Sequence, residues 1–393
     1  MKGSGETFVH KSFPSSLKIA LVIKDFNLSL GGGERYSVSL AREFQRQGIE
    51  FDVLCRSAES QKEFSIQILK VPRKTFSRSV DFDLAFQDFI STHSYSCILG
   101  LTQVRGCDIY RLGGGLLSVW DKIKYPGLCG KIKKTFSLNH RLNLQLEKQI
   151  LEHPKLRFLV VNSELVRTQV LEEYPNHSER IFLIENAVNQ EIFFQKNQTS
   201  AEKNNFLKSL GVTSENVILL FAANNFERKG LFSLLDALSE FPQKEQFSLI
   251  VAGRGDLASA KKMVFKKGLE SIVVFTGSYS NMADIYNAAD LFVLPTQYDP
   301  CSNACLEALV CGLPVITTDW NGAGMYLNTG AGTVIPSQNI KQGLKEALSQ
   351  CLDPQALTLM KQKAAQAVRS LTFQKNAESL IHLIRQSLGR GEK

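Results

Sequence analysis

The sequence predicts an α/β protein made of two doubly wound domains. Apolar runs of strand length alternate with amphipathic helical stretches along the chain, a pattern typical of parallel sheets. The 393 residues are two to three times the length of a common domain of ~150 residues. The alternation starts again after a polar stretch at about residues 189–205, which includes QKNQTSAEKNN. We therefore expect two domains of similar design, joined near residue 190.

The expected strands fall into two sets, one on each side of that stretch. The first set is 17–23, 51–55, 97–101 and 157–161, and the second is 217–223, 247–253, 271–277, 290–296 and 312–318. These sets predict an N-terminal domain over 1–190 and a C-terminal domain over 191–372. Two doubly wound domains that face each other form a cleft, and ligands are expected there at the carboxyl ends of the strands.

Composition excludes several classes of protein. Hydrophobic residues make up 44% and charged residues 21% of the chain, which is typical of a globular protein. The apolar run from Ile19 to Ile23 is too short for a signal peptide or a membrane span. The eight cysteines include no C-x-x-C pair, and we expect them to pack as small core residues in a reducing compartment. A cytoplasmic protein without a metal or other cofactor is the expectation.

One acidic pair matches the D-x-D pattern that holds a metal in some sugar transferases. Asp81-Phe82-Asp83 lies where an amphipathic helix is expected to open, because apolar residues recur after it at helical spacing. Carboxylates stabilise the first turn of a helix. We therefore interpret the pair as helix capping.

The net charge of +8 includes a basic run without acids. It lies between Asp121 and Glu147, is interleaved with aromatic residues such as Trp120 and Tyr125, and contains Lys122, Lys124, Lys131, Lys133 and Lys134. Two interpretations stay open: a solvated surface, or a contact with an anionic membrane surface. No nucleic-acid-binding motif is recognisable, so nucleic acid is not an expected partner.

Three loops between a strand and a helix are candidates for ligand binding. The first is Gly31-Gly32-Gly33-Glu34, where glycines allow close approach of a ligand and a helix is expected to begin near Glu34. The pattern is not G-x-G-x-x-G, which disfavours dinucleotide binding. A tight turn without a ligand is the alternative.

The second loop, Asn225 to Gly230, contains the adjacent cations Arg228 and Lys229 at the start of a helix. Such a pair suits a diphosphate, because arginine can bind two oxygens while lysine adds a point charge. A solvated basic pair is the alternative.

The third loop, Asp299 to Ala308, is the most informative. Ser302 is expected to cap a helix, which would present the amides of Asn303, Ala304 and Cys305 to a phosphate or hydroxyl group. Glu307, one turn later, could accept hydrogen bonds from a ribose diol, and Asp299 could meet sugar hydroxyls. A capped helix with two solvated acids is the alternative.

Taken together, these motifs resemble family-four glycosyltransferases of the retaining, GT-B type, and among them the transferases of the lipopolysaccharide core. The resemblance runs from about Leu17 to the end of the chain. It is carried, in family order, by LGGGERYSVSLAREFQRQG, VNSELVRTQVLEEYP, IENAVNQEIF, LLFAANNFERKGLFSLLDAL, LIVAGRGD and ADLFVLPTQYDPCSNACLEALVCGLPVITT.

The resemblance implies roles for individual residues. Arg228 and Lys229 would neutralise the diphosphate leaving group, and Glu307 would bind the nucleotide ribose. The other residues that it implies for the donor are Asp299, Gly32, Gly33, Asn225, Gly253, Ser302, Asn303, Ala304 and Cys305. The family needs no metal. A helix from about residue 373 to 393 would cross back onto the first domain.

The implied function is transfer of a sugar from a nucleotide-diphosphate donor to a cell-envelope glycolipid, by a cytoplasmic protein peripheral to the inner face of the membrane. Two departures from the family pattern bear on this. Asp299 stands where most members have the longer glutamate. Leu117 stands where related transferases have a histidine that faces the donor sugar, which leaves open a changed donor or an idle, sugar-nucleotide-binding scaffold.

Overall fold

The computed structural model describes residues 17–28, 31–59, 63–125, 137–213 and 215–389. Grouping by contacts divides the chain into two compact units. The first unit comprises Met1–Leu112, Lys133–Val160 and Ala377–Lys393, and the second comprises Gly113–Ile132 and Val161–Asn376. The predicted boundary at residue 190 thus differs from a division by contacts, which groups 113–132 and 161–190 with the C-terminal residues. Each unit is described by itself.

The first sheet has seven strands among the described residues, in the order β5-β3-β1-β6-β7-β8-β9. These are β1 (Ile19–Val22), β3 (Phe51–Cys55), β5 (Ser65–Ile68), β6 (Cys97–Gly100), β7 (Ile109–Leu112), β8 (Phe158–Val161) and β9 (Ile181–Leu183). The order places β1 between β3 and β6, and both pairings are parallel. All four residues of β1 are buried, as expected for a strand covered on both faces. A short ladder joins β2 (Asp25–Phe26) to β4 (Ser57–Ala58).

Helices follow the strands as the alternation predicts. Those from the amino-terminal part are α1 (Gly32–Arg46), α2 (Arg78–Ile90), α3 (Leu117–Lys124), α5 (Leu138–Leu151) and α6 (Glu164–Glu173). The C-terminal helix, α14 (Phe373–Gly389), belongs from Ala377 onward to the first unit. There the Arg157 guanidinium donates a hydrogen bond to the backbone carbonyl of Ser387.

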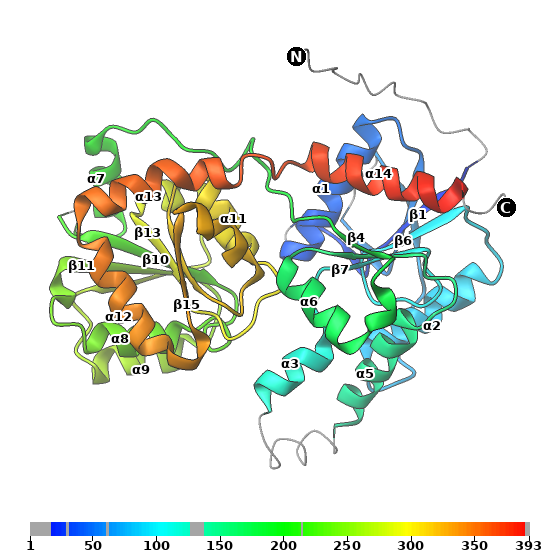
Figure 1. The fold of residues 1–393 in the computed structure, drawn as a ribbon, viewed down its shortest axis with the longest axis horizontal. Coiled ribbons are helices and arrows are strands. Elements are labelled where there is room, and N and C mark those ends of the chain that lie inside the picture. Colours follow the sequence, from blue (N-terminus) through cyan, green and yellow to red (C-terminus); the bar gives the residue numbers. More distant parts are fainter. Residues whose placement is uncertain (1–16, 29–30, 60–62, 126–136, 214, 390–393) are drawn as a thin grey trace. The chain divides into compact units, whose positions relative to one another are not determined.

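The second unit contains a six-stranded parallel sheet among the described residues, in the order β12-β11-β10-β13-β14-β15. Its strands are β10 (Val217–Ala223), β11 (Phe247–Gly253), β12 (Val273–Gly277), β13 (Leu291–Leu294), β14 (Val315–Thr318) and β15 (Gly332–Ile335). Its helices are α7 (Ser200–Ser209), α8 (Leu231–Ser239), α9 (Leu257–Lys266), α10 (Met282–Ala288), α11 (Asn303–Val310), α12 (Ile340–Cys351) and α13 (Pro354–Ala367). Figure 1 shows α8, α9 and α12 along one face of this sheet and α11 and α13 along the other.

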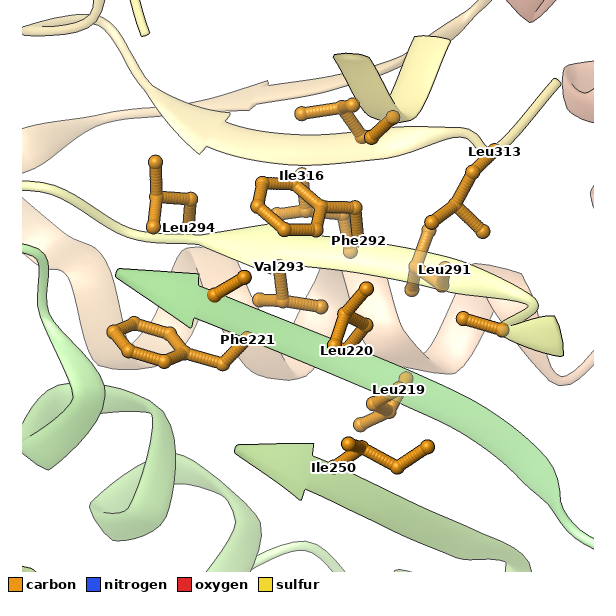
Figure 2. Close-up of a cluster of buried hydrophobic side chains, with 14 of the residues drawn as sticks. Leu219, Leu220, Phe221, Ile250, Leu291, Phe292, Val293, Leu294, Leu313 and Ile316 are labelled. Carbon is orange, nitrogen blue, oxygen red and sulfur yellow. The ribbon is translucent and has the colours of Figure 1, made fainter. Parts of the chain in front are cut away.

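The core of the second unit explains why its strands are continuously apolar. Leu219, Leu220 and Phe221 of β10 are fully buried, and Figure 2 shows them beside side chains of β11, β13 and β14. Because helices cover both faces, side chains that point to either face are removed from water. The predicted ranges of β10 and β11 agree with the structure to the residue.

The strand order defines where a ligand site belongs in the second unit. The first two connections, β10–β11 and β11–β12, run outward in one direction, and β13 then returns to the other side of β10. In doubly wound sheets, ligands bind at the carboxyl ends of the strands where the order reverses. The loops that follow β10 and β13 leave the sheet at this point, and they carry the second and third predicted motifs.

Several expectations are corrected by the structure. The polar stretch at 189–205 is not a linker throughout, because α7 begins at Ser200, where the Thr199 hydroxyl and the Glu202 carboxylate form a capping box. The helix after the first glycines begins at Gly32 rather than near Glu34. The N-cap of α2 is Ser77, so Asp81 and Asp83 do not cap it.

The aspartates of the D-x-D sequence are engaged elsewhere. Asp83 is fully buried and pairs with the Arg105 guanidinium at 2.6 Å. Asp81 accepts hydrogen bonds from the backbone amides of Lys74 and Thr75. Within the described ranges, no group of three or more His, Cys, Asp or Glu side chains is arranged to hold a metal ion.

Two further expectations concern the core and the membrane. The seven cysteines in the described part of the chain are free thiols in buried positions, as predicted for core residues, while Cys129 lies outside it. No helix among the described residues is both long and apolar enough to cross a bilayer.

A partly buried ion cluster links two helices of the second unit and gives a testable prediction. The Asp290 carboxylate lies 2.7 Å from both Lys203 Nζ and Lys361 Nζ, and it accepts the Ile218 amide at 2.9 Å. Burial alone would raise the pKa of Asp290, but the two ammonium groups outweigh it, so its pKa is lowered. Asp290→Asn should destabilise the unit by about 1–2 kcal/mol at pH 7, because two partly exposed lysines lose their shared carboxylate.

The lowered pKa of Asp290 determines how the stability of the unit depends on pH. A carboxyl group with a lowered folded-state pKa stabilises the fold above its unfolded pKa of about 3.9, and the stabilisation is lost as the pH falls through the folded value. The difference in thermal unfolding between wild type and Asp290→Asn should therefore be large at pH 7 and shrink toward about pH 3. A difference that stayed constant over this range would contradict an ionic origin.

Candidate active site

The loop after β10 brings Arg228 and Lys229 to the reversal point of the second sheet. The Asn225 side chain closes the turn by accepting the Arg228 amide at 3.0 Å, and the Asn225 carbonyl accepts the Lys229 amide at 3.0 Å. The turn ends at Gly230, whose φ of +86° lies in the left-handed region. A Cβ atom there would lie 2.0 Å from the Pro295 carbonyl oxygen, so only glycine fits.

Backbone contacts hold this turn against the loop that follows β13. The Arg228 carbonyl accepts the amide of Gln297 at 2.8 Å and the Thr296 hydroxyl at 3.2 Å. These hydrogen bonds therefore fix the two loops against each other. The structure thus brings together the second and third motifs of the sequence.

Lys229 and Asp299 form an ion pair at the centre of this arrangement. Their side chains are only 15% and 10% exposed, so the pair lies mostly out of solvent. An ammonium group has three N–H donors, and one contact with Asp299 leaves two for phosphate oxygens. Asp299 therefore orients the lysine without using up its capacity to bind an anion.

Arg228 points toward an aromatic cluster. Its guanidinium carbon lies 5.8 Å from the centre of the Trp120 ring, within the range of a cation–π contact. The Trp120 ring stacks on Tyr298 with a centroid separation of 6.1 Å, and the Tyr298 hydroxyl donates to Gln169 at 3.0 Å. The sequence reasoning missed the structural role of Trp120 and Tyr298, because only the fold brings residues 120 and 298 together.

Helix α11 begins beside the ion pair. Ser302 is its N-cap as predicted, but the serine side chain accepts no hydrogen bond from the first turn. The amides of Asn303, Ala304 and Cys305 therefore point out of an uncapped helix end, which is a favourable place for an anion. Asn303 and Ala304 are partly exposed and Cys305 is buried.

Asp299 precedes Ser302, the N-cap of α11, by only three residues. Because Lys229 pairs with Asp299, the lysine of the second motif lies near the first turn of the helix in the third motif. In that turn, burial raises the pKa of the Cys305 thiol to about 12.

The turn from Asp299 to Asn303 is held by side chains from distant parts of the chain. The Ser163 hydroxyl donates to the Pro300 carbonyl at 2.6 Å, and the Asn186 amide donates to Asn303 Oδ1 at 2.8 Å. Asn321 Oδ1 accepts the Ser302 amide at 3.2 Å. Sequence reasoning did not assign these roles to Ser163, Asn186 or Asn321, since each contact spans a long separation in the chain.

Glu307 lies one turn into α11, as predicted. Its carboxylate accepts a hydrogen bond from the Tyr286 hydroxyl at 3.1 Å, and its side chain is partly exposed. Burial and this neighbouring carboxylate raise the pKa of Tyr286 well above its ordinary value, so the hydroxyl stays a donor. A carboxylate fixed in this way can still accept hydrogen bonds from a diol.

The remaining predicted residues are placed as follows. Gly253 ends β11 with a φ of +108°, and a Cβ atom there would lie 2.1 Å from the Ala223 carbonyl oxygen, so its glycine is explained by close backbone packing. Gly32 and Gly33 open α1 in the first unit. Their predicted role at the donor stays a prediction.

The predicted basic surface is only partly described. Lys122 pairs with Glu173 at 2.6 Å, and Lys124 lies over the Tyr125 ring at 5.2 Å. Lys131, Lys133 and Lys134 lie outside the described residues.

Comparison with known proteins identifies the fold, and a family model matches the part of the chain that contains the two motifs. A family model described as "Glycosyl transferases group 1" matches residues 215–354, which contain both motifs of the site. A crystal structure of WaaG, described as a glycosyltransferase involved in lipopolysaccharide biosynthesis, superposes with a TM-score of 0.78 at 19% identity and covers 93% of this chain and 99% of that one. Anabaena Alr3699/HepE in complex with UDP and glucose superposes with a TM-score of 0.71 at 18% identity, covering 94% and 100%. The predicted GT-B fold is confirmed.

Comparison of sequences adds a relative whose reaction is known. The lipopolysaccharide glucosyltransferase WaaG of Escherichia coli (strain K12) is 23% identical over 351 residues, covering 84% of this chain and 88% of its own length. The predicted resemblance is thus confirmed: this chain is a GT-B protein with a glycosyl transferases group 1 segment, and it is related to a transferase of lipopolysaccharide synthesis.

Proposed function

We propose that this chain is a retaining, metal-independent glycosyltransferase that moves a sugar from a nucleotide-diphosphate donor to a glycolipid of the cell envelope, with the lipopolysaccharide core as the acceptor class. One observation carries the proposal: the Lys229–Asp299 pair lies beside the uncapped start of α11, where the order of the second sheet reverses. That arrangement suits a diphosphate. We place the protein in the cytoplasm, peripheral to the inner face of the membrane.

The proposed reaction follows from the charges of the site. The bond between the sugar C1 and the diphosphate oxygen breaks, and negative charge grows on the leaving diphosphate. Lys229, Arg228 and the amides of Asn303 to Cys305 would stabilise that charge. The acceptor hydroxyl would attack C1 from the face that the diphosphate leaves, and its proton would pass to a diphosphate oxygen. The products are a glycosylated acceptor and a nucleoside diphosphate, so the step needs no protein base and no added cofactor.

Two measurements on the wild-type chain test the proposal. A panel of sugar nucleotides is screened by thermal shift, because a ligand that binds only the folded state raises the unfolding temperature. The best donor is then incubated with lipopolysaccharide-core acceptors, and release of nucleoside diphosphate is followed with the anomeric configuration of the product. Stabilisation by a donor and transfer with retained configuration are expected. An inverted product would contradict the retaining mechanism.

Leu117 supports a second candidate function. It opens α3, and the family resemblance of the sequence implies a histidine at this position. An idle sugar-nucleotide-binding scaffold would be stabilised by a donor in the same screen but would release no nucleoside diphosphate with any acceptor or with water. Turnover of the donor rejects this candidate, and binding without turnover rejects the transferase.

Glu307 gives a specific prediction for the nucleotide end of the site. Glu307→Gln should weaken the binding of a nucleoside diphosphate about tenfold, because a neutral amide is a weaker acceptor for ribose hydroxyls than a carboxylate. Binding of inorganic pyrophosphate, which has no ribose, should not change. Isothermal calorimetry with both ligands measures the difference. Equal losses for both ligands would show that Glu307 does not act through the ribose.

A further inference from the structure

The loop between β5 and α2, together with the first residue of α2, presents an unusual surface in the first unit. Residues 70–78, here called the basic loop, contain four exposed cations and no acid: Lys70, Arg73, Lys74 and Arg78. Phe76 lies among them with 76% of its surface exposed. Exposure of a whole phenyl ring among cations has no explanation in the packing of the fold.

The basic loop is held in place by a network of hydrogen bonds. Asp81, which is 3% exposed, accepts the amides of Lys74 and Thr75 at 3.2 and 2.7 Å. The Thr75 hydroxyl donates to the Ser77 carbonyl and accepts the Ser77 amide, both at 3.0 Å. These contacts place Phe76 between two fixed residues, so the framework of the loop directs this ring outward.

The basic loop also contacts the start of α5. The Ser77 hydroxyl donates to Asn143 Oδ1 at 2.8 Å. The surface of the basic loop therefore combines four exposed cations with one exposed aromatic ring, and no acid lies within the loop.

We propose that the basic loop docks this protein on an anionic lipid bilayer, with Phe76 inserted at the interface and the cations at the headgroups. Cations attract an anionic surface, and an aromatic ring gains by leaving water for the headgroup boundary. A nucleic acid or an acidic protein would match the charge but would not account for the exposed ring of Phe76. The inference rests in part on the proposed function, because a glycolipid acceptor resides in a membrane.

A second exposed phenylalanine provides a matched control. Phe265 on α9 is also 76% exposed, and lysines flank it at 261, 262 and 266. Exposed acids stand near the two ends of this helix, Asp256 at its N-cap and Glu270 beyond its end, unlike in the basic loop. Comparison of Phe76→Ser with Phe265→Ser therefore separates the proposed surface from general attraction by exposed phenylalanine and lysine.

The test is sedimentation of the full chain with vesicles of phosphatidylcholine alone or with 30% phosphatidylglycerol. Wild type should bind the anionic vesicles preferentially. Phe76→Ser should lower the partition coefficient about tenfold, as expected for loss of a buried phenyl ring. Arg73→Ala with Lys74→Ala should lower it about 25-fold, at roughly fivefold per cation. Phe265→Ser should bind like wild type.

Three results would overturn the proposal. They are equal binding to both vesicle types, a loss in Phe265→Ser that matches the loss in Phe76→Ser, and binding to a short oligonucleotide that Phe76→Ser leaves intact while vesicle binding is absent. Thermal unfolding of each variant should match wild type, because the substituted side chains are exposed. Donor hydrolysis or transfer to an acceptor in detergent is measured in parallel. If wild type shows neither hydrolysis nor transfer, the proposed function is contradicted. If wild type is active but does not bind vesicles, only the docking surface is contradicted.

Discussion

Lys229→Ala will lower the rate of sugar transfer by roughly two to four orders of magnitude. The effect is large because the ammonium group is fixed beside Asp299, mostly out of solvent, where a charge acts on the leaving diphosphate more strongly than in water. Steady-state kinetics with the donor identified by thermal shift measures kcat and KM separately. The loss should appear mainly in kcat, because the charge on the diphosphate grows as the bond breaks.

Two comparisons separate this electrostatic role from a structural one. Lys229→Ala also removes the cation that pairs with the Asp299 carboxylate. The unfolding temperature of this variant is therefore measured together with its rate. Lys229→Arg keeps the charge and should recover part of the rate, whereas an effect through stability alone would follow the unfolding temperature of each variant. Lys208→Ala, an exposed change on α7, should leave kcat unchanged. Turnover of Lys229→Ala at the wild-type rate would exclude Lys229 from the reaction.

Gly230→Ala will destabilise the second unit by about 3 kcal/mol or more. Two costs add here. An alanine would have to keep the φ of +86°, and its Cβ would lie 2.0 Å from the Pro295 carbonyl oxygen. The backbone must move to remove this clash, and because the turn carries Lys229, donor binding should weaken as well. Chemical unfolding measures the stability, and calorimetry with a nucleoside diphosphate measures the binding.

Gly211 supplies the control for this prediction. Its φ of +75° is similar, but a Cβ atom there would meet nothing within 4 Å. Gly211→Ala therefore imposes the backbone strain without the clash, and about 1 kcal/mol is expected. If the two alanine variants lost the same free energy of unfolding, close packing against Pro295 would not be the reason for glycine at position 230.

The sequence predicts the parts of this molecule that depend on local pattern. The apolar runs of β10 and β11 predict these strands to the residue, because strands buried on both faces carry a largely apolar signal. The apolar runs also locate the second and third motifs, because a loop that follows a strand begins at the carboxyl end of that strand. The start of α11 at Ser302 is also predicted correctly, although the serine side chain does not cap the helix as expected.

Local pattern fails where a distant residue decides the structure. Helix α7 is missed because its residues are polar, and a capping box sets its start within a stretch that resembles a linker. From the sequence alone, Asp83 is interpreted as a helix-capping residue, but in the folded chain it pairs with Arg105. Asn321 and Ser163 hold the turn at Ser302 and Pro300 across long separations in the chain, which no spacing rule reveals.

The central claim is that Lys229 and the start of α11 hold one diphosphate. A crystal structure of the chain with a nucleoside diphosphate is the most direct measurement. We expect the diphosphate oxygens within hydrogen-bond distance of Lys229 Nζ and of at least one of the amides from Asn303 to Cys305, with the ribose at Glu307. A nucleotide bound elsewhere, or a diphosphate that contacts neither the lysine nor the helix start, would contradict the claim.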